Sequence, residues 1–154
     1  MCSSDLAAYF KELAQRPDGP AKMLVLGEDW CGDVIRGLPV LARIAEAAGI
    51  PISIFPRDSH TDIINEFLKD GKYMSIPVAV FYTADHDYIC HWIERPAIAE
   101  KEQHEIGQTI RDENPGIDDQ AFGRERRART AAKADDWIAA TVVELKELLA
   151  KSLA

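Results

Sequence analysis

Short runs of consecutive apolar residues recur along the first hundred residues of the chain. Four of these runs are long enough for buried strands, and they cover residues 23–26, 50–55, 77–82 and 88–93. The connection between the last two runs is long enough only for a hairpin, so these two strands are expected to be antiparallel. The pattern therefore predicts a sheet that mixes parallel and antiparallel strands.

Apolar residues at helical spacing lie between these runs. A first helix is expected after the capping residues 3–5 and before the turn-rich residues 16–20. A second helix begins near Cys31 and ends at Gly49, and Pro39 inside it is expected to produce a kink. Its predicted inward-facing residues are Ile35, Leu38, Leu41, Ile44 and Ala48. A third helix is predicted over residues 61–70, with Ile63, Ile64, Phe67 and Leu68 on one face.

The last third of the chain is predicted to be helical. One helix covers residues 97–111 after Pro96, residues 114–116 interrupt the chain, and a long helix runs from about 131 to 153. Five residues of the long helix form one apolar stripe: Trp137, Ile138, Val142, Leu145 and Leu149. The stripe favours packing against the sheet, and a dimer interface is the alternative.

The order of these elements predicts an α/β fold. A central mixed sheet is flanked by helices and followed by a helical C-terminal extension. The chain has 154 residues, 47% of them apolar, which suits a single domain with a real core. We expect the core over residues 22–93 and the extension over residues 97–154.

Charge and cysteine content restrict the function and the compartment. The net charge of −8 argues against nucleic acid and anionic membranes as partners, because both are negatively charged and bind basic surfaces. Residues 1–15 do not read as a signal peptide, and no run of 18 apolar residues occurs. Three cysteines do not make a secreted disulfide framework. We therefore expect a cytoplasmic protein.

Cys31 lies where the first apolar run is followed by a helix, in the stretch GEDWCGDV. A thiol near a helix N-terminus faces unpaired N–H groups and the positive end of the helix dipole, which both stabilise a thiolate. Glu28, Asp29 and Asp33 oppose this effect because nearby like charges disfavour a further negative charge. Cys31 is therefore the candidate nucleophile, and an inert cysteine at a helix start is the alternative.

Three features of the chain together resemble the thioredoxin family. Residues 30–32 (Trp-Cys-Gly) follow a buried strand and open a helix, as in the family's W-C-G-x-C motif. Pro39 follows Cys31 by eight residues, as the family's helix-kinking proline does, and residues 75–77 (Ser-Ile-Pro) match its cis-proline element. The resemblance covers residues 22–93, and the E-D-W-C-G-D form looks like a bacterial thioredoxin-like subgroup.

The resemblance implies a thioredoxin-like fold and a role for each matching residue. Cys31 is the catalytic residue, with Trp30 and Gly32 shaping the approach to it. The bond before Pro77 is expected to be cis, and the backbone of Ile76 is expected to bind an extended substrate peptide. These expectations imply protein or peptide thiols and disulfides as partners.

The site departs from the family at two positions. The motif continues with Asp33 and Val34, and Val34 stands where the family's second cysteine resolves a mixed disulfide. Val25 stands where the family keeps a buried acid. The two departures point to thiol–disulfide exchange by a single cysteine, the monothiol route. A redox-inactive module that binds peptides in the cis-proline groove is the alternative, so enzymatic activity stays open.

The remaining chemistry-bearing residues carry weaker predictions. Cys90 is expected to be a small buried core residue, and Cys2 near the terminus is expected to have no role in the reaction. Either cysteine is the alternative candidate to resolve a disulfide at Cys31. We expect no metal, because the four histidines are not spaced from the cysteines as metal ligands are: His60, His86, His91 and His104. Four arginines form a basic cluster: Arg124, Arg126, Arg127 and Arg129. The cluster is interpreted as the solvated start of a helix, and a binding site for an acidic partner is the alternative. We expect no bound cofactor, with glutathione as a candidate external thiol, and a monomer or a weak homodimer.

Overall fold

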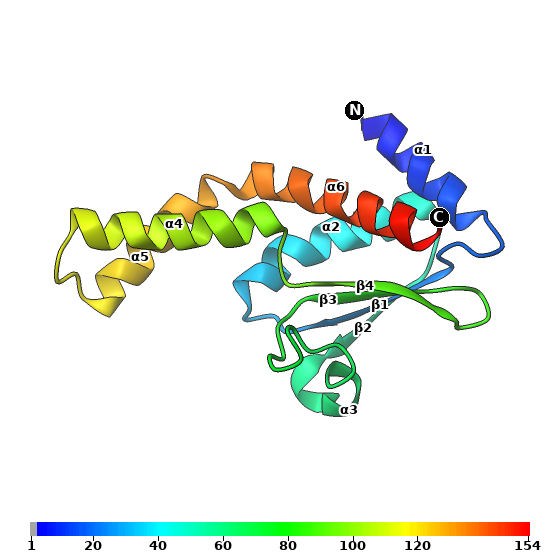
Figure 1. Cartoon of the computed structure of the whole chain (residues 1–154), viewed down its shortest axis with the longest axis horizontal. Helices are drawn as coiled ribbons and strands as arrows, with labels where there is room; N and C mark the ends of the chain where they lie inside the picture. The colour runs from blue at the N-terminus through cyan, green and yellow to red at the C-terminus, as the bar shows by residue number, and fades with distance from the viewer. Residues whose placement is uncertain (1–2) are drawn as a thin grey trace.

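The computed structural model describes residues 3–154 and contains one four-stranded sheet with helices on both faces (Figure 1). The strands are β1 (Lys22–Gly27), β2 (Ile52–Pro56), β3 (Val78–Tyr82) and β4 (Tyr88–Ile93). Their order in the sheet is β2-β1-β3-β4. Strands β1 and β2 are parallel, whereas the β1–β3 and β3–β4 pairs are antiparallel. The predicted α/β fold with a mixed sheet is therefore confirmed.

The central strands β1 and β3 are buried on both faces, because successive residues along each of them point alternately into two separate cores. One core lies between the sheet and the helices α1 (Ser3–Ala14), α2 (Gly32–Ala48) and α6 (Ala134–Ser152), as Figure 1 shows. Met23 and Val25 of β1 belong to this core. Leu26 and Val34 belong to the second core, which packs against Ile64 on the opposite face.

Helix α2 carries the candidate cysteine at its start. It ends at Gly49, whose φ of 70° lies in the left-handed region that glycine adopts without strain. Pro39 lies inside the helix, as the sequence indicates. The prediction that Ile35 faces inward is wrong, because Ile35 is 62% exposed. The buried stripe instead begins one residue earlier, at Val34.

The helix predicted over residues 61–70 is much shorter than expected. Helix α3 covers only Thr61–Ile64, after the 3-10 turn η1 (Arg57–Ser59). The chain then turns back at Asp70 and Gly71, which both have positive φ angles, and a bridge joins Lys69 to Tyr73. These turn residues end the helical pattern, although Ile64 and Phe67 are buried as the spacing predicts.

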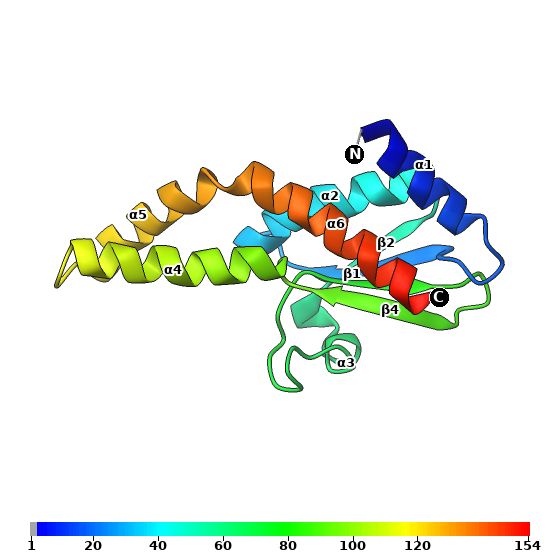
Figure 2. The same ribbon diagram turned by 45° about the horizontal axis from the view of Figure 1, so that its top comes forward.

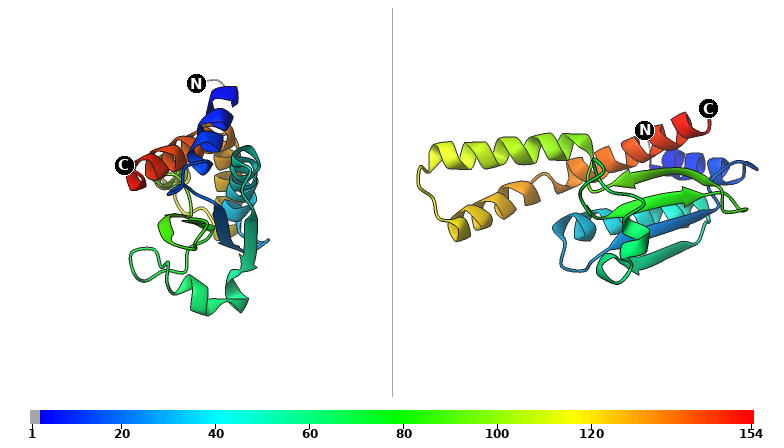
Figure 3. Two further views of the ribbon diagram at one scale, coloured as in Figure 1. Left: turned by 90° about the vertical axis from the view of Figure 1, so that its right-hand side faces the viewer. Right: turned by 60° about the horizontal axis from the view of Figure 1, so that its bottom comes forward.

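Three helices make the C-terminal region: α4 (Ala97–Glu113), α5 (Asp119–Ala131) and α6. Helices α4 and α5 lie side by side and project beyond the sheet, and α6 returns across α2 and β4 (Figures 2 and 3). We call the α4–α5 pair the arm. Helix α5 is not predicted from the sequence as a separate element, and the arginine cluster lies within it rather than at a helix start.

Helix α6 packs as the apolar stripe predicts at four of its five positions. Trp137, Leu145 and Leu149 are buried and Val142 packs partly buried against the core, whereas Ile138 is 39% exposed and so faces away from the core. Within residues 3–154, no helix combines the length and the apolar character needed to cross a membrane.

Candidate functional site

Cys31 is the N-cap residue of α2, directly after the loop that follows β1. Its backbone is extended, with φ −86° and ψ 123°, and its carbonyl oxygen accepts a hydrogen bond from the Ile35 amide at 3.0 Å. The thiol is half-buried and donates to the Ile76 carbonyl oxygen at 3.8 Å. The thiol therefore lies at the positive end of a 17-residue helix and beside the loop that precedes β3.

The loop beside Cys31 contains a cis peptide bond between Ile76 and Pro77. Both residues are buried, so the loop is held in place while its Ile76 carbonyl points toward the thiol. Gly37 of α2 faces this loop, and a Cβ atom there would lie only 3.2 Å from Cγ of Pro77. Glycine at this position therefore lets α2 approach Pro77 closely. The sequence analysis missed this role of Gly37.

Val34 lies one helical turn after Cys31 and faces the interior. It is 4% exposed and packs against Gly27, where a Cβ atom would meet a Val34 methyl carbon at 3.1 Å. Val25 is fully buried in the core on the other face of the sheet. Neither side chain carries a group that accepts a proton or attacks a disulfide.

A groove of about 340 Å³ runs past Cys31 and is bordered by exposed apolar side chains. Trp30, Tyr73 and Met74 line it and are 62%, 59% and 44% exposed. The Arg57 guanidinium lies 5.2 Å from the centre of the Trp30 ring and donates to the Met74 carbonyl oxygen at 3.0 Å. Exposed apolar side chains around a reactive group mark a surface for binding another molecule.

The sequence analysis missed four residues of this groove, namely Arg57, Tyr73, Met74 and Glu94. They lie in loops or in the short turn η1, which have no hydrophobic period, so no pattern singles them out. For Tyr73 and Met74 a signal is available in their position just before the Ser75-Ile76-Pro77 element. Gly32 and Asp33 lie next to Cys31, where the sequence places them.

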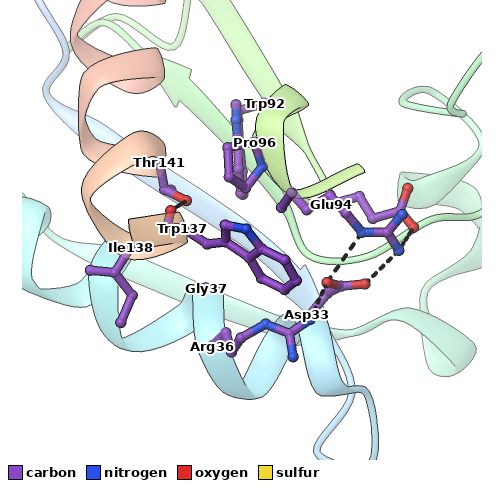
Figure 4. Close-up of a pocket in the computed structure, with 11 residues that line it drawn as sticks. Asp33, Arg36, Gly37, Trp92, Glu94, Pro96, Trp137, Ile138 and Thr141 are labelled. Carbon is purple, nitrogen blue, oxygen red and sulfur yellow. Dashed lines mark hydrogen bonds and ion pairs between the residues drawn. The ribbon is translucent and has the colours of Figure 1, made fainter. Parts of the chain in front are cut away.

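Asp33 is held by two arginines and so is not an unpaired negative charge beside Cys31. Its carboxylate accepts from Arg36 at 2.7 Å and from Arg95 at 2.7 and 3.3 Å (Figure 4). The expected opposition of Asp33 to a thiolate is therefore reduced. Glu28 also has a partner, because its carboxylate accepts from the Asp58 backbone amide at 2.8 Å.

Arg95 lies at the centre of an ion-pair network between α2 and the arm. It pairs with Asp33 and Glu94, and Lys69 joins Glu94 to Glu100 with distances of 2.6 and 2.8 Å. Burial alone would lower the pKa of Arg95. The hydrogen bond to Asp33 and the negative charges of Asp33, Glu94 and Glu100 outweigh this effect, so the pKa of Arg95 is raised. Arg95 therefore stays cationic and fixes the position of Asp33.

The other cysteines lie elsewhere or are not described. Cys90 of β4 is 4% exposed in the core that includes α6 and does not line the groove. Burial raises the pKa of the Cys90 thiol, and a hydrogen bond with Ser152 opposes this only in part. Cys2 lies outside the described residues. In residues 3–154, no three His, Cys, Asp or Glu side chains gather in an arrangement that could hold a metal ion.

Comparisons with known proteins agree with this architecture. A family model described as thioredoxin matches residues 3–111. A crystallised protein of unknown function from Pseudomonas aeruginosa is similar, with 20% identity, a TM-score of 0.61, and coverage of 99% of this chain and 76% of that chain.

A second similar structure is an HIV epitope-scaffold, with 15% identity and a TM-score of 0.59. The similarity covers 96% of this chain and 84% of the scaffold chain. At these identities the two structures show the shared fold alone. No curated protein matches the chain.

Proposed function

The chain belongs to the thioredoxin family, and we propose that it carries out thiol–disulfide exchange through Cys31 by a monothiol route. The observation that carries the proposal is the Cys31 thiol at the start of α2, half-exposed in an apolar groove and 3.8 Å from the Ile76 carbonyl. The substrates are protein or peptide disulfides. A reducing cytoplasm supplies a suitable external thiol and is the compartment that we propose.

The first step forms a mixed disulfide. The Cys31 thiolate attacks one sulfur of the substrate disulfide, the substrate S–S bond breaks, and the other substrate sulfur leaves as a thiolate that takes up a proton. The helix N-terminus stabilises the attacking thiolate. Trp30 and Ile76, which line the groove together with the thiol, hold the substrate segment: Trp30 by side-chain contact and the Ile76 backbone by strand-like hydrogen bonding.

The second step releases Cys31 and uses an external thiol, for which we propose glutathione. Its thiolate attacks one sulfur of the mixed disulfide, and the bond between Cys31 and the substrate breaks. When the attack falls on the substrate sulfur, Cys31 leaves as a thiolate and the substrate carries the external thiol as a new disulfide. When it falls on the Cys31 sulfur, the substrate leaves as a thiolate and Cys31 carries glutathione; a second glutathione thiolate then attacks the glutathione sulfur, which frees Cys31 and forms glutathione disulfide. Val34 offers no internal thiol, and Val25 offers no acid for proton transfer, so the external thiol is required.

Replacing Val34 by cysteine tests the monothiol route. Position 34 lies one helical turn from Cys31, so Val34→Cys supplies a resolving thiol. We expect wild-type turnover of a peptide disulfide to stop after one event per chain when no small thiol is present. With the enzymatic reductant of a bacterial thioredoxin supplied, the variant should exceed wild type by about tenfold, because a resolving thiol restores dithiol exchange.

Val34→Ser is the matched control, because serine has nearly the volume of cysteine but does not resolve a disulfide. The smaller side chains remove methyl contacts with Gly27, so we expect Val34→Cys to lose about 1 kcal/mol of stability. Val34→Ser should lose about 2–4 kcal/mol because it also buries a hydroxyl, so rates are compared per folded chain. Equal gains in both variants would show that packing, and not the new thiol, changes the rate. Repeated turnover by wild type without any small thiol would contradict the monothiol proposal.

The exposed apolar groove also supports a second candidate function, a redox-inactive module that binds extended peptides. Trp30, Tyr73 and Met74 offer contact area that does not depend on the thiol. In that case Cys31→Ser would bind peptides as wild type does, and wild type would exchange no disulfide. Measuring both binding and exchange therefore separates the two candidates.

A further inference from the structure

The arm and the start of α2 enclose a second groove, which the exchange steps above do not use. One part has a volume of about 330 Å³ and joins α2 to both helices of the arm. A further part of about 350 Å³ continues along the arm between α4 and α5. Both parts share the lining residues Arg95, Gln103, Phe122 and Arg126. We call the two parts together the arm groove.

The arm groove is strongly cationic. Five guanidinium groups line it, against the carboxylates of Asp33 and Glu100. The five arginines are Arg36, Arg95, Arg111, Arg126 and Arg127. Asp33 already pairs with Arg36 and Arg95, and Glu100 with Lys69, so both carboxylates are engaged. The surplus of positive charge stands out in a chain whose net charge is −8.

Three of these arginines lack a carboxylate partner, and two of them contact neutral side chains instead. Arg126 donates to the side-chain oxygen of Gln103 at 3.1 Å, and the Arg111 guanidinium lies 4.3 Å from the centre of the Phe122 ring. No carboxylate of residues 3–154 forms an ion pair with Arg111, Arg126 or Arg127 in the structure. Charged donors that face a groove without a carboxylate partner favour an anionic ligand.

Arg129 shows that the arm does not lack carboxylates. It pairs with Glu113 and Glu125 at 2.6 Å each and does not line the arm groove. The carboxylates of Glu113 and Glu125 are therefore used outside the groove.

The arm groove adjoins the groove at Cys31. Asp33 lines both, and Gly32, which follows Cys31 in the chain, lines the arm groove. Along α4, the lining residues extend from Glu100 to Arg111, a rise of about 16 Å. An extended peptide covers that length with about five residues. The dimensions therefore match a short peptide segment better than a single carboxylate.

We propose that the arm groove binds an acidic segment that flanks the cysteine of the protein substrate. The inference rests on the proposed exchange function, because it names the substrate class of that site. Arg126 and Arg127 of α5 bind the carboxylates of the segment, while the substrate cysteine lies against Cys31. The arm is thus a specificity element that selects acidic substrates for an acidic protein.

Two measurements on the full chain test this proposal. The first is the affinity, by fluorescence anisotropy, of a labelled cysteine-free peptide of four glutamates. The second is the rate at which Cys31 exchanges with three disulfide peptides, whose acidic residues precede the cysteine, follow it or are absent. We expect one acidic peptide to react about fivefold faster than the neutral peptide at low salt, and the preference to fade in high salt.

Arg127→Gln and Arg124→Gln are a matched pair of variants. Both remove one exposed arginine charge from α5, but Arg124 lines neither part of the arm groove. We expect Arg127→Gln to weaken tetraglutamate binding about threefold and Arg124→Gln to leave it nearly unchanged. Combining Arg126→Gln with Arg127→Gln should weaken binding about tenfold.

The outcomes separate this proposal from the exchange function. If Arg127→Gln and Arg124→Gln weaken tetraglutamate binding equally, or if the exchange rate shows no preference for an acidic peptide, the arm groove is not a binding site for acidic segments. Either result would leave the proposed exchange at Cys31 intact. A third result is tetraglutamate binding that is weakened by the Arg126→Gln and Arg127→Gln substitutions and not by Arg124→Gln, while the protein shows no exchange activity. That result would support acidic-segment binding in the arm groove and overturn the exchange function. Tight binding of free acetate that competes with the peptide would overturn the peptide segment as the ligand.

Discussion

Serine in place of Cys31 is expected to lower glutathione-supported turnover of a peptide disulfide by about a hundredfold or more. A serine hydroxyl does not attack a disulfide at neutral pH, and Val34 offers no substitute nucleophile. The variant should fold, because serine is a preferred N-cap residue and Cys31 occupies the N-cap of α2. The measurement is the turnover rate of variant and wild type at one glutathione concentration, with thermal unfolding as the check on folding.

Cys90→Ser is the control for this result. The Cys90 thiol is buried between the sheet and α6 and does not line the groove, so the turnover rate per folded chain should stay within about twofold of wild type. A large loss in Cys90→Ser at unchanged stability would place Cys90 in the reaction. Unchanged turnover in Cys31→Ser would remove Cys31 from the account and favour the binding module.

Alanine in place of Trp137 is expected to destabilise the chain by about 3–5 kcal/mol. Trp137 is 3% exposed, its indole N–H donates to the Glu102 carboxylate of α4 at 2.6 Å, and its ring lies 5.3 Å from the Arg36 guanidinium (Figure 4). One side chain therefore joins α6, α4 and the start of α2. The measurement is urea unfolding followed by circular dichroism.

Ile138→Ala is the matched control for Trp137→Ala, because the neighbouring residue is 39% exposed. Its loss of buried area is small, and we expect a cost of about 1 kcal/mol or less. Similar costs for the two variants would mean that α6 does not pack through Trp137. Retained stability in the Trp137→Ala protein, with unchanged resistance to proteolysis between residues 97 and 131, would likewise contradict the proposed packing.

The strands and the position of the candidate cysteine are predictable because local sequence determines them. Continuous apolar runs locate all four strands to within about two residues. Strand β3 is buried along almost its whole length and carries no charged position that interrupts the run, whereas β2 and β4 keep exposed residues. Gly49 and the stretch Trp30-Cys31-Gly32 mark the two ends of α2 in the same local way. These features need no knowledge of residues distant in the sequence.

Features that depend on distant contacts escape the sequence analysis. The Asp33–Arg95 pair joins residues 62 positions apart, and neither residue carries a pattern that indicates the other. Helix α5 is rich in charge and lacks an apolar stripe, so the spacing rule that finds α6 does not find it. The predicted length of α3 is wrong for the opposite reason. The apolar spacing continues past Ile64, where the helix ends, and the chain turns at Asp70 and Gly71.

The most direct test of the account is to locate the mixed disulfide that Cys31 forms. Reduced wild-type protein is incubated with glutathione disulfide at neutral pH, quenched with acid, and analysed by intact mass and peptide mapping. The account predicts one glutathione per chain, attached to Cys31 and removed by reduced glutathione. An intrachain disulfide between Cys31 and Cys90, or a glutathione adduct that avoids Cys31, would contradict it.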